Sequence, residues 1–408
     1  MAHDRKFRFG VQTGGATSAQ EWKEKARKIE ALGYSTLYMP DHFIDTPYAP
    51  MVGIAMAAEA TDTLRVGTLV LGNDYKHPAV VAKEFASIDV LSDGRVEAGI
   101  GAGWMTSDYE ALGLPYESHG TRIERLGEAV AILKGSWGDG PFSLDGRHYK
   151  IKDYDGIPKP TQQPRPPILV GGGGPRLLRL AGREADIVGI NPNLRAGEIS
   201  SDAVQDTIAA MTKQKIEWVR EGAGDRFDDL ELQIRYFMTS ITDDRHALAA
   251  AIAPGFGLEP DVALESGVAL VGTVDECCDL LAERREEWGV SYVVLGDDQY
   301  EAFAPVVARL AGCEQELSRL RDRRCARVGS RSGRLRRRKR RHRERVRPAD
   351  DERGHRVHGY PDVRGRAGHR PHDPRDLLRM DLEGLRGRGA GEPGVRDLGR
   401  RGEHRRTP

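Results

Sequence analysis

The segment Tyr38–Phe43, YMPDHF, places an aspartate and a histidine directly after an apolar run. Histidine titrates near neutral pH, so His42 can give or take a proton, and Asp41 is a candidate for the carboxylate that orients it. In a barrel, residues that follow the carboxyl end of a strand face the active site. The alternative is structural, with Asp41 capping the next segment and His42 packing. The residues alone leave both interpretations open.

Two glycine-rich segments also end apolar runs. Gly171–Gly174 stand between a short apolar run and Pro175, which suits the first position of a helix. A helix start offers free N–H groups to an anion, which favours a phosphate site. In GIGAGW, Gly99–Trp104, a flat ligand could lie against bare backbone, unless the interior simply requires small residues there. Neither segment has the G-x-G-x-x-G spacing, which disfavours a Rossmann site.

Up to residue 312, eight apolar runs alternate with helical patterns. The predicted strands are Phe7–Gln12, Ser35–Asp41, Leu64–Gly72, Arg95–Gly103, Ile168–Gly172, Ala185–Ile190, Leu232–Ile241 and Ser291–Gly296. The predicted helices include Ala19–Leu32, Met51–Ala60, Pro78–Leu91, Thr121–Trp137, Asp202–Glu221, Val274–Trp288 (with a Thr273/Glu276 capping box) and Glu301–Ala311. Both a doubly wound sheet and a (β/α)8 TIM barrel satisfy this α/β alternation, and the count of eight favours the barrel. Gly138–Pro160 interrupts it and predicts a hairpin that turns at Asp145-Gly146.

The zero net charge of the chain hides two unlike parts. Residues 313–408 hold 30 Lys+Arg against 15 Asp+Glu, which leaves 32 basic and 47 acidic residues for 1–312. Twenty-nine of those 30 basic residues are Arg, and Ile, Phe, Trp and Asn are absent from residue 314 onward. This composition predicts a disordered Arg-rich tail, and its GC-rich coding bias indicates a frame-shift product. The functional alternative is a nucleic-acid arm centred on Arg334–Arg345, which would bind nucleic acid non-specifically.

Cysteine and histidine usage predicts neither disulfides nor a metal site. The four cysteines show no metal spacing and no paired framework, and Cys277 and Cys278 are expected in a helix core. His119 and His148 are interpreted as surface residues rather than ligands. No signal peptide and no membrane-spanning run are present, so we expect a cytoplasmic protein with no membrane partner.

Residues 1–312 resemble the luciferase-like monooxygenase superfamily, and within it the actinobacterial oxidoreductases that use the deazaflavin coenzyme F-420. The matching motifs are PDHF, GTLVLGNDYKHPAVVAKEFASIDVLSDGRVEAGIGAGW, PPILVGGGG, AGREADIV and LVGTVDE. The resemblance implies a TIM barrel that binds its cofactor at the carboxyl ends of the strands. It also implies a domain boundary near residue 312.

The resemblance assigns roles to individual positions. Asp41 and His42 would lie near the reactive ring as catalytic residues. The cofactor would be bound by Leu69 and Val70 (at a non-proline cis peptide that backs the ring), by Gly101, Ala102 and Gly103 along it, and by Gly171, Gly172, Gly173 and Gly174 with Arg176 at its phosphate. One position departs from the related sugar-phosphate dehydrogenases, which carry a glutamate where this chain has Trp104. That departure argues against glucose 6-phosphate and predicts an apolar or planar small-molecule substrate beside Trp104.

The cofactor decides the reaction class. Coenzyme F-420 passes hydride, whereas FMN in the same barrel would insert one oxygen atom from O2 into the substrate. The resemblance favours F-420, with FMN as the alternative, and implies a homodimer. Because the body of the chain is acidic, local positive charge must attract the anionic cofactor, and the candidate residues are Lys76, His77, Arg176, Arg179 and Arg183.

Overall fold

The strands of the protein close into a barrel. The structure is a computed structural model that describes residues 5–311. The barrel strands are β1 (Arg8–Gln12), β2 (Thr36–Met39), β3 (Arg65–Thr68) followed by β4 (Leu71–Gly72), β5 (Val96–Gly101), β8 (Ile168–Gly172), β9 (Ile187–Ile190), β10 (Glu231–Arg235) and β13 (Val290–Gly296). All pair in parallel, and β3 contacts both β2 and β5, which closes the ring. The barrel prediction is confirmed, and the doubly wound alternative is wrong.

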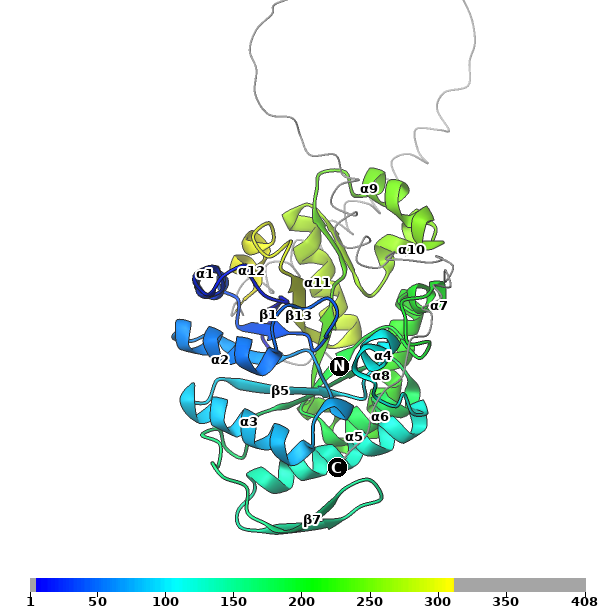
Figure 1. Ribbon diagram of the computed structural model, residues 1–408. Coiled ribbons are helices and arrows are strands. Elements are labelled where there is room, and N and C mark those ends of the chain that lie inside the picture. The colour runs from blue at the N-terminus through cyan, green and yellow to red at the C-terminus, as the bar shows by residue number, and fades with distance from the viewer. Residues whose placement is uncertain (1–4, 312–408) are drawn as a thin grey trace, which may run out of the picture. The chain divides into compact units, whose positions relative to one another are not determined.

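Helices surround the strands on the outside of the barrel (Figure 1). They are α1 (Ala19–Ala31), α2 (Pro50–Ala60), α3 (Pro78–Leu91), α5 (His119–Trp137), α6 (Pro175–Glu184), α8 (Ala209–Ala223), α11 (Val274–Trp288) and α12 (Ala304–Leu310). Their apolar residues follow the helical period, so that α1, for example, buries Trp22, Ala26 and Ile29 against the strands. The predicted Thr273/Glu276 capping box is present at the start of α11.

A charged network fills the barrel near the amino ends of its strands. Glu97 of β5 is completely buried and binds the guanidinium groups of Arg8 and Arg65 and the hydroxyl groups of Tyr38 and Tyr292. Burial alone would raise the pKa of Glu97, but the charges of Arg8 and Arg65 outweigh it and lower that pKa to about 2. Above this network lies a small apolar layer formed by Tyr38, Leu69, Leu169, Ile187, Tyr292 and Val294.

Three predicted elements are each divided in the structure, and one of them, the strand Leu64–Gly72, is β3 followed by β4. The segment 232–241, predicted as one strand, leaves the barrel after Arg235, and β11 (Met238–Ile241) pairs instead with β12 (Ala269–Gly272). This pair packs with α9 (Arg245–Ile252), η3 (Ala253–Phe256) and α10 (Pro260–Glu265). The predicted helix 202–221 is α7 (Ser201–Gln205) followed by α8. The sequence pattern missed β12, α9, η3 and α10, and also α4 (Thr106–Leu112) and the short turns η1 (Asn73–Tyr75) and η2 (Gly224–Asp229).

The predicted hairpin is present, formed by β6 (Phe142–Asp145) and β7 (Lys150–Tyr154). Glu128 of α5 ties it to the barrel, because its carboxylate accepts the backbone N–H groups of Arg147, His148 and Tyr149. Residues 312–408 lie outside the described residues, so the predicted boundary at residue 312 and the predicted properties of the tail stay predictions.

Candidate active site

The predicted site residues follow the carboxyl ends of three barrel strands. Asp41 and His42 follow β2, Ala102–Trp104 follow β5, and Gly173 and Gly174 follow β8. Because the barrel strands are parallel, these ends lie at the same rim of the barrel, where TIM-barrel enzymes carry their active sites.

His42 is oriented by a carboxylate that sequence reasoning did not find. Its Nδ1 lies 2.7 Å from Oδ2 of Asp108, and the other oxygen of Asp108 accepts the backbone N–H of Phe43 at 2.9 Å. The side chain of Asp108 is completely buried, whereas that of His42 is 20% exposed. The interpretation of Asp41 as the partner of His42 is therefore wrong. Asp108 lies in α4, a short helix 66 residues away along the chain.

Asp41 instead holds the backbone that follows β3. Its Oδ2 accepts the N–H of Gly72 at 3.0 Å. Burial raises the pKa of the Asp41 carboxyl, while the Gly72 bond and the nearby His42 and Lys76 offset part of that rise. Asp41 and His42 thus share a rim position but have different partners.

Trp104 lies against His42. The two rings meet edge to face, with centroids 5.5 Å apart, and the backbone oxygen of Trp104 accepts the hydroxyl of Tyr116. Exposed apolar side chains follow other strand ends: Phe43 and Ile44 after β2, and Phe237 after β10. Exposed apolar side chains are thus part of the rim that carries His42 and Trp104.

The Leu69–Val70 peptide bond is cis, as the resemblance implies. The side chain of Val70 fits between two of the predicted cofactor residues: a Cβ on Gly101 would lie 2.6 Å from Val70 Cγ2, and one on Gly171 would lie 3.6 Å from Cγ1. Gly103 has a φ of +73°, and its Cβ would meet the Tyr109 hydroxyl. Ala102 is buried. Gly101 and Gly103 therefore satisfy packing within the protein itself, which favours the structural interpretation of GIGAGW.

The glycines after β8 have different neighbours. A Cβ on Gly172 would clash with Leu177, and one on Gly173 would lie 2.5 Å from backbone atoms of Asn191 and Asn193. A Cβ on Gly174 would meet only the side chains of Asn193 and His119, at 3.8 Å. Gly174 is the N-cap of α6 and has no side-chain cap, and Pro175 has no N–H, so the first helical N–H group that could bind an anion is that of Arg176. Among the four glycines, Gly174 is the one at which an added Cβ would meet nothing closer than 3.8 Å, and we call its surroundings at the start of α6 the cradle.

The expected cations are mostly paired with carboxylates. Lys76 binds Glu84, Arg176 binds Glu124, Arg179 binds Glu221, and Arg183 binds Glu184. His77 caps α3 by accepting the N–H of Ala79. These residues therefore bring little net positive charge to the cradle.

Arg122 is a further cation of α5, the helix whose first residue, His119, lies near Gly174. It is 1% exposed and lies over the Tyr116 ring, with Cζ 3.9 Å from the ring centroid. Its Nε and Nη1 have no hydrogen-bond partner among residues 5–311. The rings of Tyr109 and Tyr116 cover the guanidinium, and its two unused donors make Arg122 a candidate partner for an anion.

His119, interpreted from the sequence as a surface residue, is the first residue of α5 and lies beside Gly174. It is half-buried, and its Cε1 is 3.8 Å from the position that a Gly174 Cβ would take. Burial lowers the pKa of His119, and the charges of Arg122, Arg195 and Arg176 lower it further. His148 is also mostly buried, with 12% of its side chain exposed.

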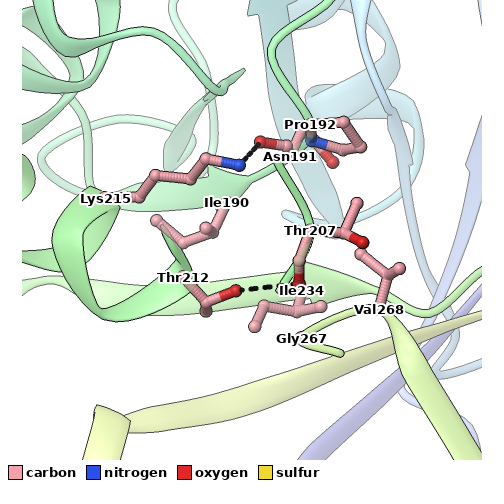
Figure 2. A pocket seen from close by; sticks show the side chains of 9 residues that line it. All are labelled: Ile190, Asn191, Pro192, Thr207, Thr212, Lys215, Ile234, Gly267 and Val268. Atoms are coloured by element: carbon pink, nitrogen blue, oxygen red, sulfur yellow. Dashed lines mark hydrogen bonds between the residues drawn. The ribbon is translucent and has the colours of Figure 1, made fainter. Parts of the chain in front are cut away.

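A small cavity lies under the segment that follows β9 (Figure 2). Lys215, 2% exposed, spans it and donates from Nζ to the backbone oxygens of Asn191, at 2.9 Å, and Asp206, at 2.8 Å. The cavity measures about 10 Å³, which is near the minimum for one water molecule, so no cofactor fits there. Lys215 instead fixes Asn191–Asn193, which border Gly173 and Gly174.

The remaining observations concern the cysteines, the possible metal ligands and the possible membrane helices. Cys277 and Cys278 are buried in α11. Within residues 5–311, no group of three or more His, Cys, Asp or Glu side chains is arranged to hold a metal ion. In that same part of the chain, no helix is both long and apolar enough to cross a membrane.

Comparison with known proteins identifies relatives along most of the barrel. The family described as "Luciferase-like monooxygenase" matches residues 5–257. An FMNH(2)-dependent dimethylsulfone monooxygenase from Pseudomonas putida is 35% identical over 134 residues, which cover 33% of this chain and 37% of that protein. An F420-dependent glucose-6-phosphate dehydrogenase from Kribbella flavida is 29% identical over 257 residues, 59% of this chain and 72% of that protein. For several of the relatives, the chain spans half of their length or less.

Solved structures share the fold at low sequence identity. An F420-dependent secondary alcohol dehydrogenase in complex with an F420-acetone adduct has a TM-score of 0.60 at 20% identity, covering 74% of this chain and 97% of that one. A long-chain alkane monooxygenase has a TM-score of 0.61 at 14% identity, covering 75% and 91%. These likenesses agree with a luciferase-like barrel.

Proposed function

Because the chain belongs to the luciferase-like monooxygenase family, we propose that it is an oxidoreductase that binds the deazaflavin coenzyme F-420 at the carboxyl end of its barrel. The bound coenzyme supplies a hydride carrier that exchanges hydride with a small organic substrate. The observation that carries this proposal is the meeting of two helix starts: Gly174 caps α6 beside His119, the first residue of α5, and Arg122 of α5 is buried without a hydrogen-bond partner for Nε and Nη1 among residues 5–311. A phosphate-bearing cofactor fits that donor set. The branch itself rests on the resemblance and on the F420-dependent relatives.

Each residue of the proposed site would have its own role. Gly174, the start of α6 and Arg122 would hold the phosphate, and Val70 would support the ring. His42 would hold the proton that accompanies the hydride. Since Asp108 binds its Nδ1, the Nε2 atom is the one available to the substrate.

The rim suggests the substrate class. Trp104 stands against His42 where a sugar-phosphate dehydrogenase would carry a glutamate, and Phe43 and Ile44, which follow His42 in the chain, are exposed. We therefore propose an apolar or planar substrate that carries no phosphate. FMN with O2 remains the second candidate, favoured by the FMNH(2)-dependent relative.

The test is a fluorescence titration of the full chain with coenzyme F-420 and, separately, with FMN. Selective binding of F-420 supports the proposal, selective binding of FMN replaces it with the monooxygenase alternative, and binding of neither overturns the site. The Arg-rich segment after residue 312 attracts any anion, so each titration is repeated at higher salt, which weakens that contribution.

Two arginine variants distinguish binding at the site from non-specific attraction of the cofactor. Arg122→Met removes the buried guanidinium, and we expect Kd to rise roughly ten- to hundredfold, as for a lost charged hydrogen bond of about 1.5–3 kcal/mol. Arg179→Met removes a surface arginine paired with Glu221 and should leave Kd unchanged. Equal effects of the two variants would mean that the cofactor is not held at the cradle.

A further inference from the structure

The side chains of Gln12 and Arg235 meet inside the barrel at its carboxyl end. Successive residues of a strand alternate between its two faces, and Arg8 of β1 binds Glu231 of β10 on the inner face. Gln12 and Arg235 each lie two alternations further along these strands, so they share that face. There, Nε of Arg235 donates to Oε1 of Gln12 at 2.9 Å.

Gln12 also binds the backbone that interrupts the third barrel strand. Its Nε2 donates to the carbonyl oxygen of Leu69 at 2.7 Å. Leu69 and Val70 lie between β3 and β4, and a backbone carbonyl that leaves a strand needs another donor. The strands joined in this way are not neighbours, because β2 lies between β1 and β3, and β13 lies between β1 and β10. Gln12 therefore ties three strand ends together across the mouth of the barrel.

Arg235 determines which way the Gln12 amide points. A guanidinium group only donates hydrogen bonds, so the atom of Gln12 beside its Nε must be the amide oxygen. The NH2 group of the amide is thereby left to face the Leu69 carbonyl. Arg235 is itself held in place, since its Nη1 donates to the backbone oxygen of Tyr236 and its Cζ lies 4.5 Å from the centroid of the Phe237 ring.

We propose that Gln12, its amide oriented by Arg235, is a positioning residue for the hydride transfer. It holds the Leu69 carbonyl and thereby the side chain of Val70. The inference rests on the proposed function, in which Val70 supports the ring of the cofactor. The Val70 methyl groups lie beside glycines of β5 and β8, so a shift of this backbone moves the support relative to those strands. A small displacement of the reacting atoms lowers the rate steeply.

The first experiment follows Val70 without any cofactor, by methyl NMR of the full chain. The Val70 signals are assigned by their loss in Val70→Ala. Gln12→Glu keeps an acceptor for Arg235 but removes the donor to Leu69, and we expect both Val70 signals to shift. Gln12→Met removes both hydrogen bonds without adding a charge, and it carries the test if Gln12→Glu does not fold. Val70 signals that stay in place in the folded variants would overturn the proposal.

Thr13→Val is the matched control. Thr13 is the next residue of the chain, and its hydroxyl donates to Oδ2 of Asp297 at 2.6 Å. The substitution keeps the shape and removes a hydrogen bond at the same strand end, so it measures the effect of loosening the barrel mouth in general. The Val70 signals should keep their positions. A shift as large as that in the Gln12 variants would contradict a specific role of Gln12.

The second experiment uses the cofactor that the titrations identify. In both Gln12 variants we expect Kd to rise roughly two- to tenfold, as for one neutral hydrogen bond, and the visible absorption maximum of the bound ring to shift. The value of kcat should fall by a larger factor, because a misplaced ring reacts slowly even when it is bound. Arg235→Met should cause smaller changes of the same kind, since the Gln12 amide is still present. A purely structural role of Gln12 would lower Tm and leave the absorption maximum and kcat of the loaded enzyme unchanged.

The outcomes separate this inference from the proposed function. If a cofactor binds and both Gln12 variants keep the absorption maximum and kcat of the wild type, Gln12 is not a positioning residue and the proposed function stands. If neither cofactor binds to the wild type, the proposed function is wrong and the role in hydride transfer fails with it. Shifted Val70 signals in Gln12→Glu would then still show that Gln12 fixes Val70.

Discussion

The carboxylate of Asp108 lies 2.7 Å from Nδ1 of His42 and at the same time accepts the N–H of Phe43. One completely buried side chain thus fixes both the ring and the backbone of the strand end that carries it. This arrangement matters for proton transfer, because a fixed Nδ1 contact determines which nitrogen faces the substrate.

Asp108→Asn should lower turnover while leaving the cofactor bound. The amide keeps the shape and can still accept the Phe43 N–H, but it no longer balances the charge that forms on His42. We expect kcat to fall about 10- to 100-fold with Kd for the cofactor unchanged. Steady-state kinetics and a fluorescence titration measure the two quantities. A parallel loss of cofactor affinity would show that Asp108 supports the cofactor site instead.

Local patterns were sufficient to predict the barrel and the rim position of His42. Apolar runs and helical periods are set by neighbouring residues, and a histidine after a strand needs no distant partner to be noticed. Asp108 could not be predicted in that way, because it lies in α4, a seven-residue helix without a clear amphipathic period, far from His42 in the sequence.

The burial of Arg122 likewise could not be predicted from the sequence alone. Its sequence context is that of an ordinary charged position near the start of a helix. It is buried because the rings of Tyr109 and Tyr116 close over it from α4 and the loop that follows. The cations that the sequence emphasised, such as Arg176 and Lys76, have carboxylate partners that only the folded chain brings near.

Asp41→Asn should stabilise the fold at neutral pH. Burial raises the pKa of Asp41 in the folded state, so its contribution to stability is present below the unfolded pKa, about 3.9, and is lost as the pH rises through the folded value. The asparagine avoids this loss and its carbonyl still accepts the Gly72 N–H. Thermal unfolding should give a higher Tm than the wild type at pH 7 and an equal Tm below about pH 4. A lower Tm at pH 7 would contradict this account.

Glu97→Gln should destabilise the barrel strongly. The change leaves Arg8 and Arg65 without their shared carboxylate inside the barrel, and breaking such a pair costs about 3–5 kcal/mol. The folded pKa of Glu97, about 2, lies below the unfolded value, so its stabilisation is present at neutral pH and is lost as the pH falls from about 4.3 toward 2. Urea unfolding at several pH values measures both effects, with the exposed Glu59→Gln as the control. A loss below 1 kcal/mol at pH 7 would be inconsistent with the network.

The homodimer stays a prediction, and its expected face lies on α2 and α3. These helices expose Val52, Met56 and Val80, with Val52 64% exposed. An outer barrel helix that is apolar on all sides is typical of a buried element. We expect a dimer by sedimentation, and a monomer for Val52→Lys with the same Tm. The control variant Ile157→Lys changes an equally exposed residue that follows the β6–β7 hairpin, and this variant should remain dimeric. A monomeric wild type would end this proposal.

Alanine substitutions at Gly173 and Gly174 distinguish an effect on packing from an effect on cofactor binding. On Gly173 the added Cβ would lie 2.5 Å from the backbone of Asn191 and Asn193, which Lys215 holds in place, so the loop must shift. Gly173→Ala should therefore cost about 1–3 kcal/mol of stability. On Gly174 the methyl group fits, since its neighbours are 3.8 Å away, and the backbone has an ordinary extended conformation.

Gly174→Ala should keep the stability of the wild type within about 0.5 kcal/mol but place the methyl group in the space proposed for the phosphate. We expect roughly a tenfold rise in the cofactor Kd, equal to about 1.4 kcal/mol. Chemical unfolding and cofactor titration of both variants give the comparison. If Gly174→Ala binds as the wild type does, then the phosphate lies elsewhere, and the buried charge of Arg122 would need another partner.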